Sequence, residues 1–369
     1  MRNRLHSLCP YFAMFPEEFA DEQIRRYSSP GDTICDIFSG RGTSLLQGLL
    51  RKRHALAVDI NPVAYCISAA KADVPRLSEV RAQLTLLEHE YEDANHTALE
   101  KQRLALPRFF HRAFYHSTLR ELLFLRSTLN WKGAPVRNFI AALVLGSLHG
   151  EMDKSKSYFS NQMPRTISTK PDYSLAFWTR EWLWPRKKNV FELLRQRAEF
   201  RLRTADVPPL DGTVVLGDAR NAGQFFPQSL GKVTLVLTSP PYLNVTSYEE
   251  DQWLRLWFLG GEPNPTYGVV SRDDRHLSPT KYWEFLSEVW EGVVPLLSRG
   301  ASLVCRIGGK DFGRKEMIDG LTGGLRDAFP KLRRKHPPVV SRIRNRQTEY
   351  FRPGSKGCLY EMDFAFTLT

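Results

Sequence analysis

The hydrophobic pattern of this chain predicts three short buried strands, at Thr33–Ile37, Ala55–Val58 and Val233–Leu237. A continuous apolar run of this length that is rich in β-branched residues is typical of a parallel strand covered on both faces. After the first run the spacing becomes helical, because the leucines of Leu45–Leu50 fall on one face of a helix. A strand, a turn and a helix in this order predict an α/β protein.

The middle of the chain has a mainly helical pattern. Apolar residues recur at helical spacing over Leu77–Arg103, and a second helix is predicted around Phe139–Gly146. The periodicity then fails in a polar loop, Lys154–Thr166, before a basic helix that ends near Arg203. We therefore divide the chain into residues 1–74, 75–210 and 211–369.

The strand at Val233–Leu237 ends abruptly in the sequence Thr-Ser-Pro-Pro-Tyr, residues 238–242. Neither Pro240 nor Pro241 can donate to a strand ladder, and each restricts the residue before it. The turn therefore presents a hydroxyl, a fixed carbonyl and an aromatic ring together at the carboxyl end of the strand. In open α/β sheets that edge is where ligands bind, although most Pro-Pro turns are simply structural stops.

The first strand runs into a turn with two glycines, Gly40 and Gly42, which allow close backbone approach and positive φ. The next strand ends at Asp59, 23 residues after Asp36. An acid at about this distance from a glycine loop is placed to bond ribose hydroxyls. Because the third glycine of a dinucleotide fingerprint is missing and the helix begins at Thr43, the loop suits a nucleoside better than a pyrophosphate. A purely structural glycine turn is the alternative.

Together these segments resemble the site-specific, amino-methylating DNA methyltransferases, which act on cytosine N4 or adenine N6 and carry a Ser/Asp-Pro-Pro-Tyr motif and a Phe-x-Gly-x-Gly-Thr cofactor loop. Three further segments resemble the family in compatible order, at His6–Phe19, Val214–Arg220 and Ala301–Gly308. The likeness covers residues 1–74 and 212–369. It implies a Rossmann-like class I S-adenosylmethionine-dependent methyltransferase sheet with a mainly helical inserted domain. The first part of the chain is then the cofactor-binding half and the last part the catalytic half.

The resemblance implies that S-adenosyl-L-methionine is the cofactor. The residues implied for its site are Phe15, Asp36, Phe38, Gly40, Gly42, Thr43, Asp59 and Asp218. Asp59 would accept from the ribose hydroxyls, Asp218 would bind the adenine amine, and Phe15 would pack over the methionine end. The family has an acid near the cofactor amino group at the position of Asp36, and the alternative for this residue is a strand-end role in bonding the loop backbone.

The catalytic residues implied by the resemblance are Ser239, Pro240, Pro241 and Tyr242. An exocyclic amine is a poor nucleophile because its lone pair is delocalised into the ring. The Ser239 hydroxyl and the Pro240 carbonyl would accept its hydrogens and offset the charge that grows during methyl transfer. Tyr242 would stack on the target base after that base has swung out of the duplex.

Serine at position 239 favours cytosine N4 by resemblance, with adenine N6 as the alternative. Carbon-5 methylation is disfavoured because it needs a thiolate nucleophile and the sequence has no Pro-Cys pair. Three other classes are weighed against this prediction: an RNA methyltransferase, a hydride-transfer enzyme and a non-catalytic DNA-binding scaffold. The RNA methyltransferase is disfavoured because no RNA-binding module is recognised. The hydride-transfer enzyme is disfavoured because the third glycine of a dinucleotide fingerprint is missing. The non-catalytic scaffold is disfavoured because Gly40, Gly42 and Ser239–Tyr242 are intact.

Charge and aromatic content point to a polyanionic partner. The formal net charge is +12, which favours attraction to nucleic acid. In the insert, basic and aromatic residues alternate, so we predict a target-recognition and DNA-clasping role. A helical lid with solvated basic faces is the alternative. Trp178 and Trp182, four residues apart, are predicted to lie in the core rather than to stack on bases.

The remaining composition sets the context. The five cysteines show no Cys-x-x-Cys pairing, which suits a reducing compartment and argues against a metal site. No apolar run is long enough to span a bilayer, and the N-terminus lacks a signal-like core. We expect a cytoplasmic, DNA-associated prokaryotic protein whose partner is double-stranded DNA. A cognate restriction or defence-system component is a further candidate partner, and the oligomeric state is left open.

Overall fold

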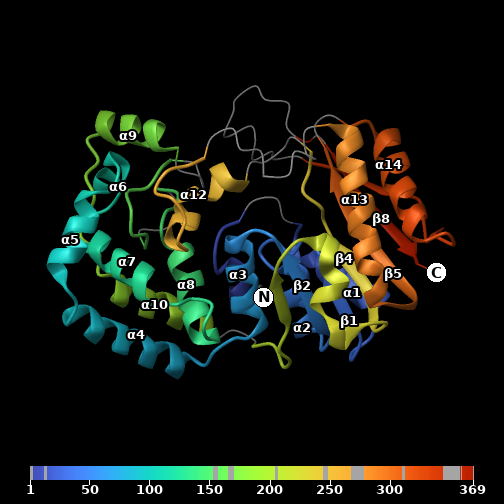
Figure 1. Cartoon of the computed structure of the whole chain (residues 1–369), viewed down its shortest axis with the longest axis horizontal. Helices are drawn as coiled ribbons and strands as arrows, with labels where there is room; N and C mark the ends of the chain where they lie inside the picture. Colours follow the sequence, from blue (N-terminus) through green and yellow to red (C-terminus); the bar gives the residue numbers. More distant parts are fainter. Residues whose placement is uncertain are drawn as a thin grey trace. The chain divides into compact units, whose positions relative to one another are not determined.

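The structure is a computed structural model, and it describes residues 3–11, 15–152, 157–164, 170–203, 207–243, 248–266, 278–309, 312–343, 358 and 360–368, with the backbone alone at 248 and 249. The chain divides into two units. One comprises Met1–Tyr11, Asp73–Val207 and Tyr248–Gly268, and the other comprises Phe12–Ala72, Pro208–Ser247 and Val269–Thr369. We name them the helical unit and the sheet unit after their contents (Figure 1). The functional division at residues 74/75 and 210/211 stays a prediction.

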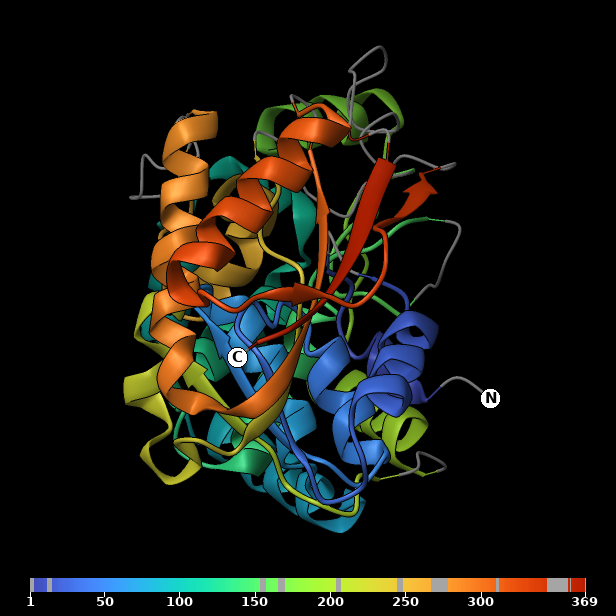
Figure 2. The same ribbon diagram turned by 90° about the vertical axis from the view of Figure 1, so that its right-hand side faces the viewer.

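Within the described residues, the sheet unit contains an eight-stranded sheet in the order β3-β2-β1-β4-β5-β8-β6, with β7 also paired to β8. Its strands are β1 (Thr33–Asp36), β2 (His54–Asp59), β3 (Thr213–Leu216), β4 (Val233–Thr238), β5 (Leu297–Gly308), β6 (Arg333–Arg334), β7 (Val339–Arg342) and β8 (Tyr360–Thr367). Strands β1 to β5 pair in parallel, whereas β8 is antiparallel to β5, β6 and β7. Figure 2 shows the red β8 alongside the long orange β5. This arrangement confirms the predicted α/β class with a Rossmann-like sheet.

Two apolar cores cover the two faces of the sheet. The helices of this unit are α1 (Glu17–Tyr27), α2 (Thr43–Leu50), α3 (Pro62–Ala72), α11 (Ala222–Phe225), α13 (Pro279–Val293) and α14 (Arg314–Ala328). Alternate strand residues face opposite layers, so Ile34 packs with α1 and α2 while its neighbour Cys35 packs with α13 and α14. Cys35 and Cys305 are buried, as predicted for core residues. The strands are therefore held from both sides, which leaves their ends to carry the polar chemistry.

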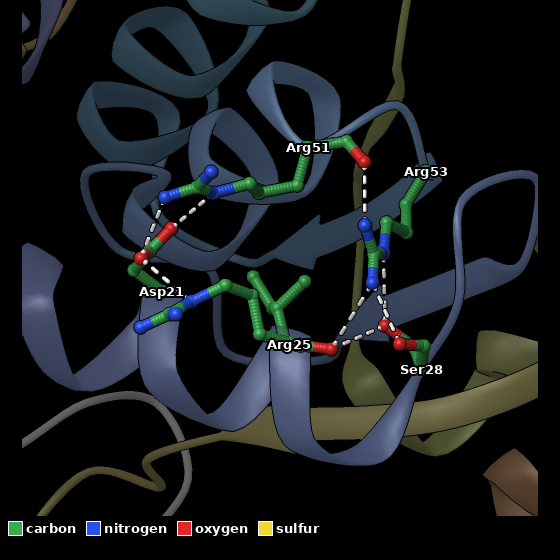
Figure 3. Close-up of polar contacts among 6 residues, drawn as sticks. Asp21, Arg25, Ser28, Arg51 and Arg53 are labelled. Carbon is green, nitrogen blue, oxygen red and sulfur yellow. Dashed lines mark hydrogen bonds and ion pairs between the residues drawn. The ribbon is translucent and has the colours of Figure 1, made fainter.

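A polar cluster joins α1 to the segment between α2 and β2 (Figure 3). Asp21 on α1 accepts two bonds from the guanidinium of Arg51, at 2.6 and 2.8 Å, and forms an ion pair with Arg25 at 3.1 Å. Arg53 donates to the backbone carbonyl of Arg51 and to that of Ser28, both at 2.6 Å. Hydrogen bonding to Arg51 lowers the pKa of Asp21. These contacts fix α1, which begins two residues after Phe15, a residue predicted to cover the cofactor.

The helical unit confirms the predicted helical insert. Its elements are the short 3-10 helix η1 (Arg4–Ser7), then α4 (Leu77–Glu92), α5 (His96–Leu104), α6 (Arg108–Ala113), α7 (His116–Thr128), α8 (Pro135–Leu145), α9 (Pro171–Arg180), α10 (Val190–Leu202) and α12 (Tyr248–Phe258). The helix predicted over Leu77–Arg103 is broken, because Asn95 caps α5 by accepting from the amide of Ala98. No helix among the described residues has the length and apolarity needed to cross a membrane.

One prediction about this unit is half wrong. Trp178 is completely buried, as expected for a core residue, but Trp182 is 80 % exposed. The reason is local, because α9 ends at Arg180 and the helical spacing that placed both rings on one face no longer applies beyond it.

Candidate active site

The predicted site residues lie in the sheet unit, around the carboxyl ends of neighbouring parallel strands. β1 pairs with β2 on one side and with β4 on the other, and β2 pairs with β3. Asp36 and Asp59 end β1 and β2, Asp218 follows β3, and Ser239 follows β4. The carboxyl ends of parallel strands meet at one edge of the sheet. The fold therefore brings the glycine turn and the Ser-Pro-Pro-Tyr turn to the same edge.

The glycine turn has the left-handed backbone that its sequence predicts. Gly40 has φ 51° and Gly42 has φ 72°, and Gly42 forms the N-cap of α2, which Thr43 begins. A Cβ added at Gly42 would lie 2.8 Å from the hydroxyl of Ser68 on α3. Since the Ser68 hydroxyl also donates to the carbonyl of Gly40 at 3.0 Å, α3 contacts the turn directly and holds its backbone. The turn is thus a tight backbone cradle in which a side chain at position 42 would crowd α3.

Asp59 holds the turn from the neighbouring strand. One carboxylate oxygen accepts from the amide of Gly40 at 2.7 Å, and the other accepts from the amide of Asn61 at 2.9 Å. Burial raises the pKa of Asp59 to about 7. Each carboxylate oxygen has two acceptor positions, so Asp59 keeps the capacity to accept from the hydroxyls of a ribose.

Asp36 is a buried junction between three elements. Its two oxygens accept from Thr238 on β4 at 2.7 Å and from Ser44 on α2 at 2.6 Å, and one of them also accepts from the amide of Phe38 at 3.2 Å. Burial raises the pKa of Asp36 to about 6. These contacts match the alternative reading of Asp36 as a residue that organises the loop, and its contact with the cofactor stays a prediction.

The other predicted cofactor residues contact side chains of the sheet unit itself. Asp218 is the N-cap of the 3-10 helix η2 (Ala219–Asn221), and its carboxylate accepts from the guanidinium of Arg220 at 2.9 and 3.0 Å. Arg220 also reaches Glu288 on α13 at 3.2 Å. Phe15 is buried with its ring 5.3 Å from that of Phe19. Because the carboxylate of Asp218 already accepts from Arg220, it would bind the adenine amine while it is paired with this arginine. The predicted Phe38 ring lies 6.1 Å from that of Phe285.

The Ser-Pro-Pro-Tyr turn is held by its neighbours rather than by its own backbone. Ser239 is partly exposed, Pro240 is buried, and the carbonyl of Pro241 accepts from the hydroxyl of Tyr282 on α13 at 2.8 Å. Tyr242 donates its hydroxyl to Glu361 on β8 at 2.9 Å. Burial and the charge of Glu361 raise the pKa of Tyr242 well above its ordinary value. Tyr242 is therefore a neutral donor at neutral pH.

An ion-pair chain continues from Tyr242 into the sheet. Arg306 on β5 forms a bidentate pair with Asp363 at 2.6 and 2.8 Å and lies 3.6 Å from Glu361. Its guanidinium also lies 3.8 Å from the ring centroid of Phe19 on α1. Sequence reasoning missed Arg306 and Glu361. The available signal was a cation in the apolar run Ala301–Ile307 and two acids at alternate positions of the last strand.

A second missed residue is Gly308, at the end of β5, directly against the Tyr242 ring. A Cβ at this position would lie 2.8 Å from Cε2 of Tyr242 and 2.8 Å from the sulfur of Cys358. Missed too was Lys71, a fully buried lysine on α3 that donates to the carbonyl of Arg41 in the glycine turn. Gly308 leaves room for the Tyr242 ring of the Ser-Pro-Pro-Tyr turn, and Lys71 holds the backbone of the glycine turn.

We predict that Gly308→Ala lowers methyl transfer by about 10-fold, because a small misplacement of the Tyr242 ring disturbs the reacting geometry. The affinity for S-adenosylmethionine should stay within about two-fold, since Gly308 contacts the Tyr242 side of the site. Gly313→Ala is the matched control, because a Cβ there meets nothing within 4 Å. Steady-state rates at saturating cofactor, with titration calorimetry for binding, test this. Equal rates for the two variants would contradict the role given to Gly308.

Comparison with known protein families finds a match at the start of the chain. Residues 2–70 match the family model N6_N4_Mtase, described as DNA methylase. That segment is similar to the DNA methylase family. It contains Phe15, both turn glycines, Asp36 and Asp59 of the predicted cofactor site, so the resemblance to amino-methylating DNA methyltransferases is confirmed over this part of the chain. The DNA methylase family uses S-adenosylmethionine, so the match supports the cofactor predicted for this segment.

The other comparisons add little. No curated protein sequence matches the chain. Similar solved structures include the rRNA methyltransferase aviRa from Streptomyces viridochromogenes (TM-score 0.35, 13 % identity, covering 99 % of this chain and 91 % of that one). Others are a putative methyltransferase from Streptococcus mutans (0.36, 8 %, 96 % and 50 %) and a methyltransferase from Methanosarcina mazei (0.36, 8 %, 97 % and 99 %). Likeness at this level supports no statement about substrate.

Within the described residues, no group of histidine, cysteine, aspartate and glutamate side chains is arranged to hold a metal ion.

Proposed function

We propose that this protein is a DNA methylase, which transfers a methyl group from S-adenosylmethionine to the exocyclic N4 amine of a cytosine flipped out of double-stranded DNA. The observation that carries the proposal is the hydrogen bond of 2.7 Å between Thr238 and Asp36. It ties the strand that leads into Ser239 to the strand that leads into the glycine turn. A methyl donor on one turn and an amine on the other would therefore meet at the same sheet edge.

The chain's residues fit the cofactor at this edge. The left-handed cradle at Gly40 and Gly42 suits a ligand that approaches the backbone closely, and Asp59 retains acceptor capacity for ribose hydroxyls. When bound, S-adenosylmethionine supplies an electrophilic methyl group on a sulfonium. The Ser239 hydroxyl and the Pro240 carbonyl would accept from the amine hydrogens, so that positive charge on nitrogen is offset as it grows. The amine proton then passes to water after transfer.

Tyr242 is proposed to position the base. Its ring is fixed between Gly308 and the bond to Glu361, so the stacking surface is ordered before the base arrives. Stacking on an aromatic ring contributes about 1–3 kcal/mol per base, which offsets part of the cost of flipping. The helical insert, residues 75–210, is proposed to grip the DNA.

Nucleoside mass spectrometry tests the proposal. Plasmid DNA is incubated with the protein and labelled S-adenosylmethionine, then digested to nucleosides. Labelled N4-methylcytosine is the expected product. N6-methyladenine would overturn the choice of base, and label in RNA in place of DNA would overturn the substrate class.

We also predict that cofactor affinity rises by about 10-fold between pH 6 and pH 8. The pKa of Asp59 is raised to about 7, and ribose hydroxyls that donate to this carboxyl favour its charged form, so binding releases a proton. Without cofactor, the same raised pKa means that the stability this carboxyl contributes is lost as pH rises from about 4 to about 7. Calorimetry across this range should show the rise in the natural protein and its loss in Asp59→Asn. An equal rise in both would contradict the assignment.

A further inference from the structure

A turn in the helical unit exposes two tryptophans. The turn comprises residues 181–188, which follow α9, and we call it the tryptophan turn (Figure 1). Trp182 is 80 % exposed and Trp184 is 67 % exposed. Trp182 also has φ 53°, in the left-handed region that a bulky residue rarely adopts. Exposure of an indole and strain at its backbone both oppose stability, which is the pattern expected where a side chain is presented to a partner.

The tryptophan turn is pinned at both ends. At its start the amide of Leu183 donates to the carbonyl of Trp178 at 2.9 Å, and the Asn161 side chain donates to the carbonyl of Leu183 at 3.4 Å. At its end the hydroxyl of Thr118 accepts from the amide of Lys188 at 2.9 Å and donates to its carbonyl at 2.6 Å. The backbone that carries the two rings is therefore fixed in advance, which lowers the entropic cost of binding.

Positive charge surrounds the rings. The guanidinium of Arg112 lies 3.7 Å from the ring centroid of Trp184. Arg186 and Lys187 within the turn are exposed. Residues 180–188 contain four cations and one acid, Glu181, which pairs with Arg180 at 2.8 Å. This surface combines cations for phosphates with flat rings for bases, so its chemistry complements a nucleic acid.

We propose that the tryptophan turn is a DNA-docking surface, on which Trp182 stacks on an unpaired base while Arg186 and Lys187 contact phosphates. This inference rests on the proposed function, in which the substrate is DNA that must open to release a base. Inside a paired duplex the faces of each base are covered by its neighbours, so an indole can stack only where the helix is open. Phosphates are present in both forms. The stacking contact of Trp182 should therefore strengthen binding only to DNA with unpaired bases, whereas the phosphate contacts of Arg186 and Lys187 should strengthen binding to paired and unpaired DNA alike.

The test compares two labelled DNA probes of the same sequence, one fully paired and one with three unpaired bases, by fluorescence anisotropy. Trp182→Ala should weaken binding to the unpaired probe by 5-fold to 50-fold, and change binding to the paired probe by less than about two-fold. Replacing Arg186 and Lys187 together by glutamine should weaken binding to both probes alike. It should also reduce the slope of affinity against salt by about two.

Two further variants separate a binding role from a structural one. Tyr173→Ala removes an aromatic side chain on α9 that is 62 % exposed but lies outside the turn, and should bind both probes as the natural protein does. Trp182→Gly places glycine where φ is 53°, so it should keep or raise the melting temperature while losing the preference for the unpaired probe. Loss of stability together with loss of binding would overturn the proposal.

The remaining outcomes distinguish the docking surface from the proposed reaction. Unchanged binding of Trp182→Ala to the unpaired probe would overturn the docking surface, even where labelled N4-methylcytosine is formed. The expected pattern of binding without methylated DNA would leave the surface standing and overturn the reaction. Anionic lipid vesicles serve as a second probe. Loss of vesicle binding without loss of DNA binding in Trp182→Ala would overturn the proposal by assigning the turn to a membrane.

Discussion

Ser239→Ala is expected to lower the rate of methyl transfer by about 10²–10³-fold, the usual cost of removing one fixed polar group aimed at developing charge. The affinity for S-adenosylmethionine should change by less than about two-fold, because Ser239 follows β4 while the glycine turn is held by Asp36, Asp59 and Ser68. Single-turnover rates with pre-bound cofactor and DNA measure the chemical step without product release. Calorimetry measures the cofactor.

The control for this variant lies on the same pair of strands. Ser298 on β5 donates to the carbonyl of Val233 at 3.1 Å, at the opposite end of β4 from Ser239. Ser298→Ala removes a hydroxyl of equal size and should leave the transfer rate within about two-fold. Near-normal turnover in Ser239→Ala would show that the hydroxyl does not accept from the amine. Loss of cofactor binding together with turnover would instead place Ser239 in the cofactor site.

Much of the sheet could be predicted because its signals are local. The predicted strand Ala55–Val58 corresponds to β2, which is two residues longer, and the predicted strand Val233–Leu237 corresponds to β4, which is one residue longer. A continuous apolar run is a local signal for a buried strand. The glycine turn followed for the same reason, because positive φ at Gly40 and Gly42 is a property of the turn itself.

What could not be predicted depends on contacts between distant parts of the chain. Tyr242, Glu361 and Arg306 meet because β8 runs antiparallel to β5 with Gly308 opposite Glu361. No local pattern gives that register. The same limit explains the error at Trp182, because helical spacing gives the face of a residue only as far as the helix continues, and α9 ends at Arg180.

Asp36 shows the same limit, because the sequence predicts the type of residue at this position but not the groups that it contacts. Its position after a strand could be predicted, but the structure is needed to see that Ser44 and Thr238 already donate to its oxygens. An acid at a strand end can face a ligand or bond its own loop, and the sequence is the same in both cases. The sequence therefore predicts an acid at this strand end, whereas the groups that it contacts are known only from the structure.

Gly42→Val is expected to weaken the binding of S-adenosylmethionine by at least about 10²-fold and to abolish methyl transfer with it. A β-branched residue is strained at φ 72°, and its Cβ would lie 2.8 Å from the Ser68 hydroxyl and 3.2 Å from the Ser68 backbone. Because α3 packs beneath the turn, the strain is relieved by moving the turn, and a displacement of about 1 Å is enough to disrupt a fixed site. Calorimetric titration with S-adenosylmethionine is the direct measurement.

The matched control separates this crowding from the backbone cost. Gly231 has φ 67°, and a Cβ there meets nothing within 4 Å, so Gly231→Val carries a similar left-handed penalty at a turn outside the site. Both variants should therefore lose stability in thermal unfolding, whereas Gly42→Val alone should lose cofactor affinity. A normal titration by a folded Gly42→Val protein would mean that the cofactor does not bind at the glycine turn. The proposed meeting of methyl donor and amine at this sheet edge would then be wrong.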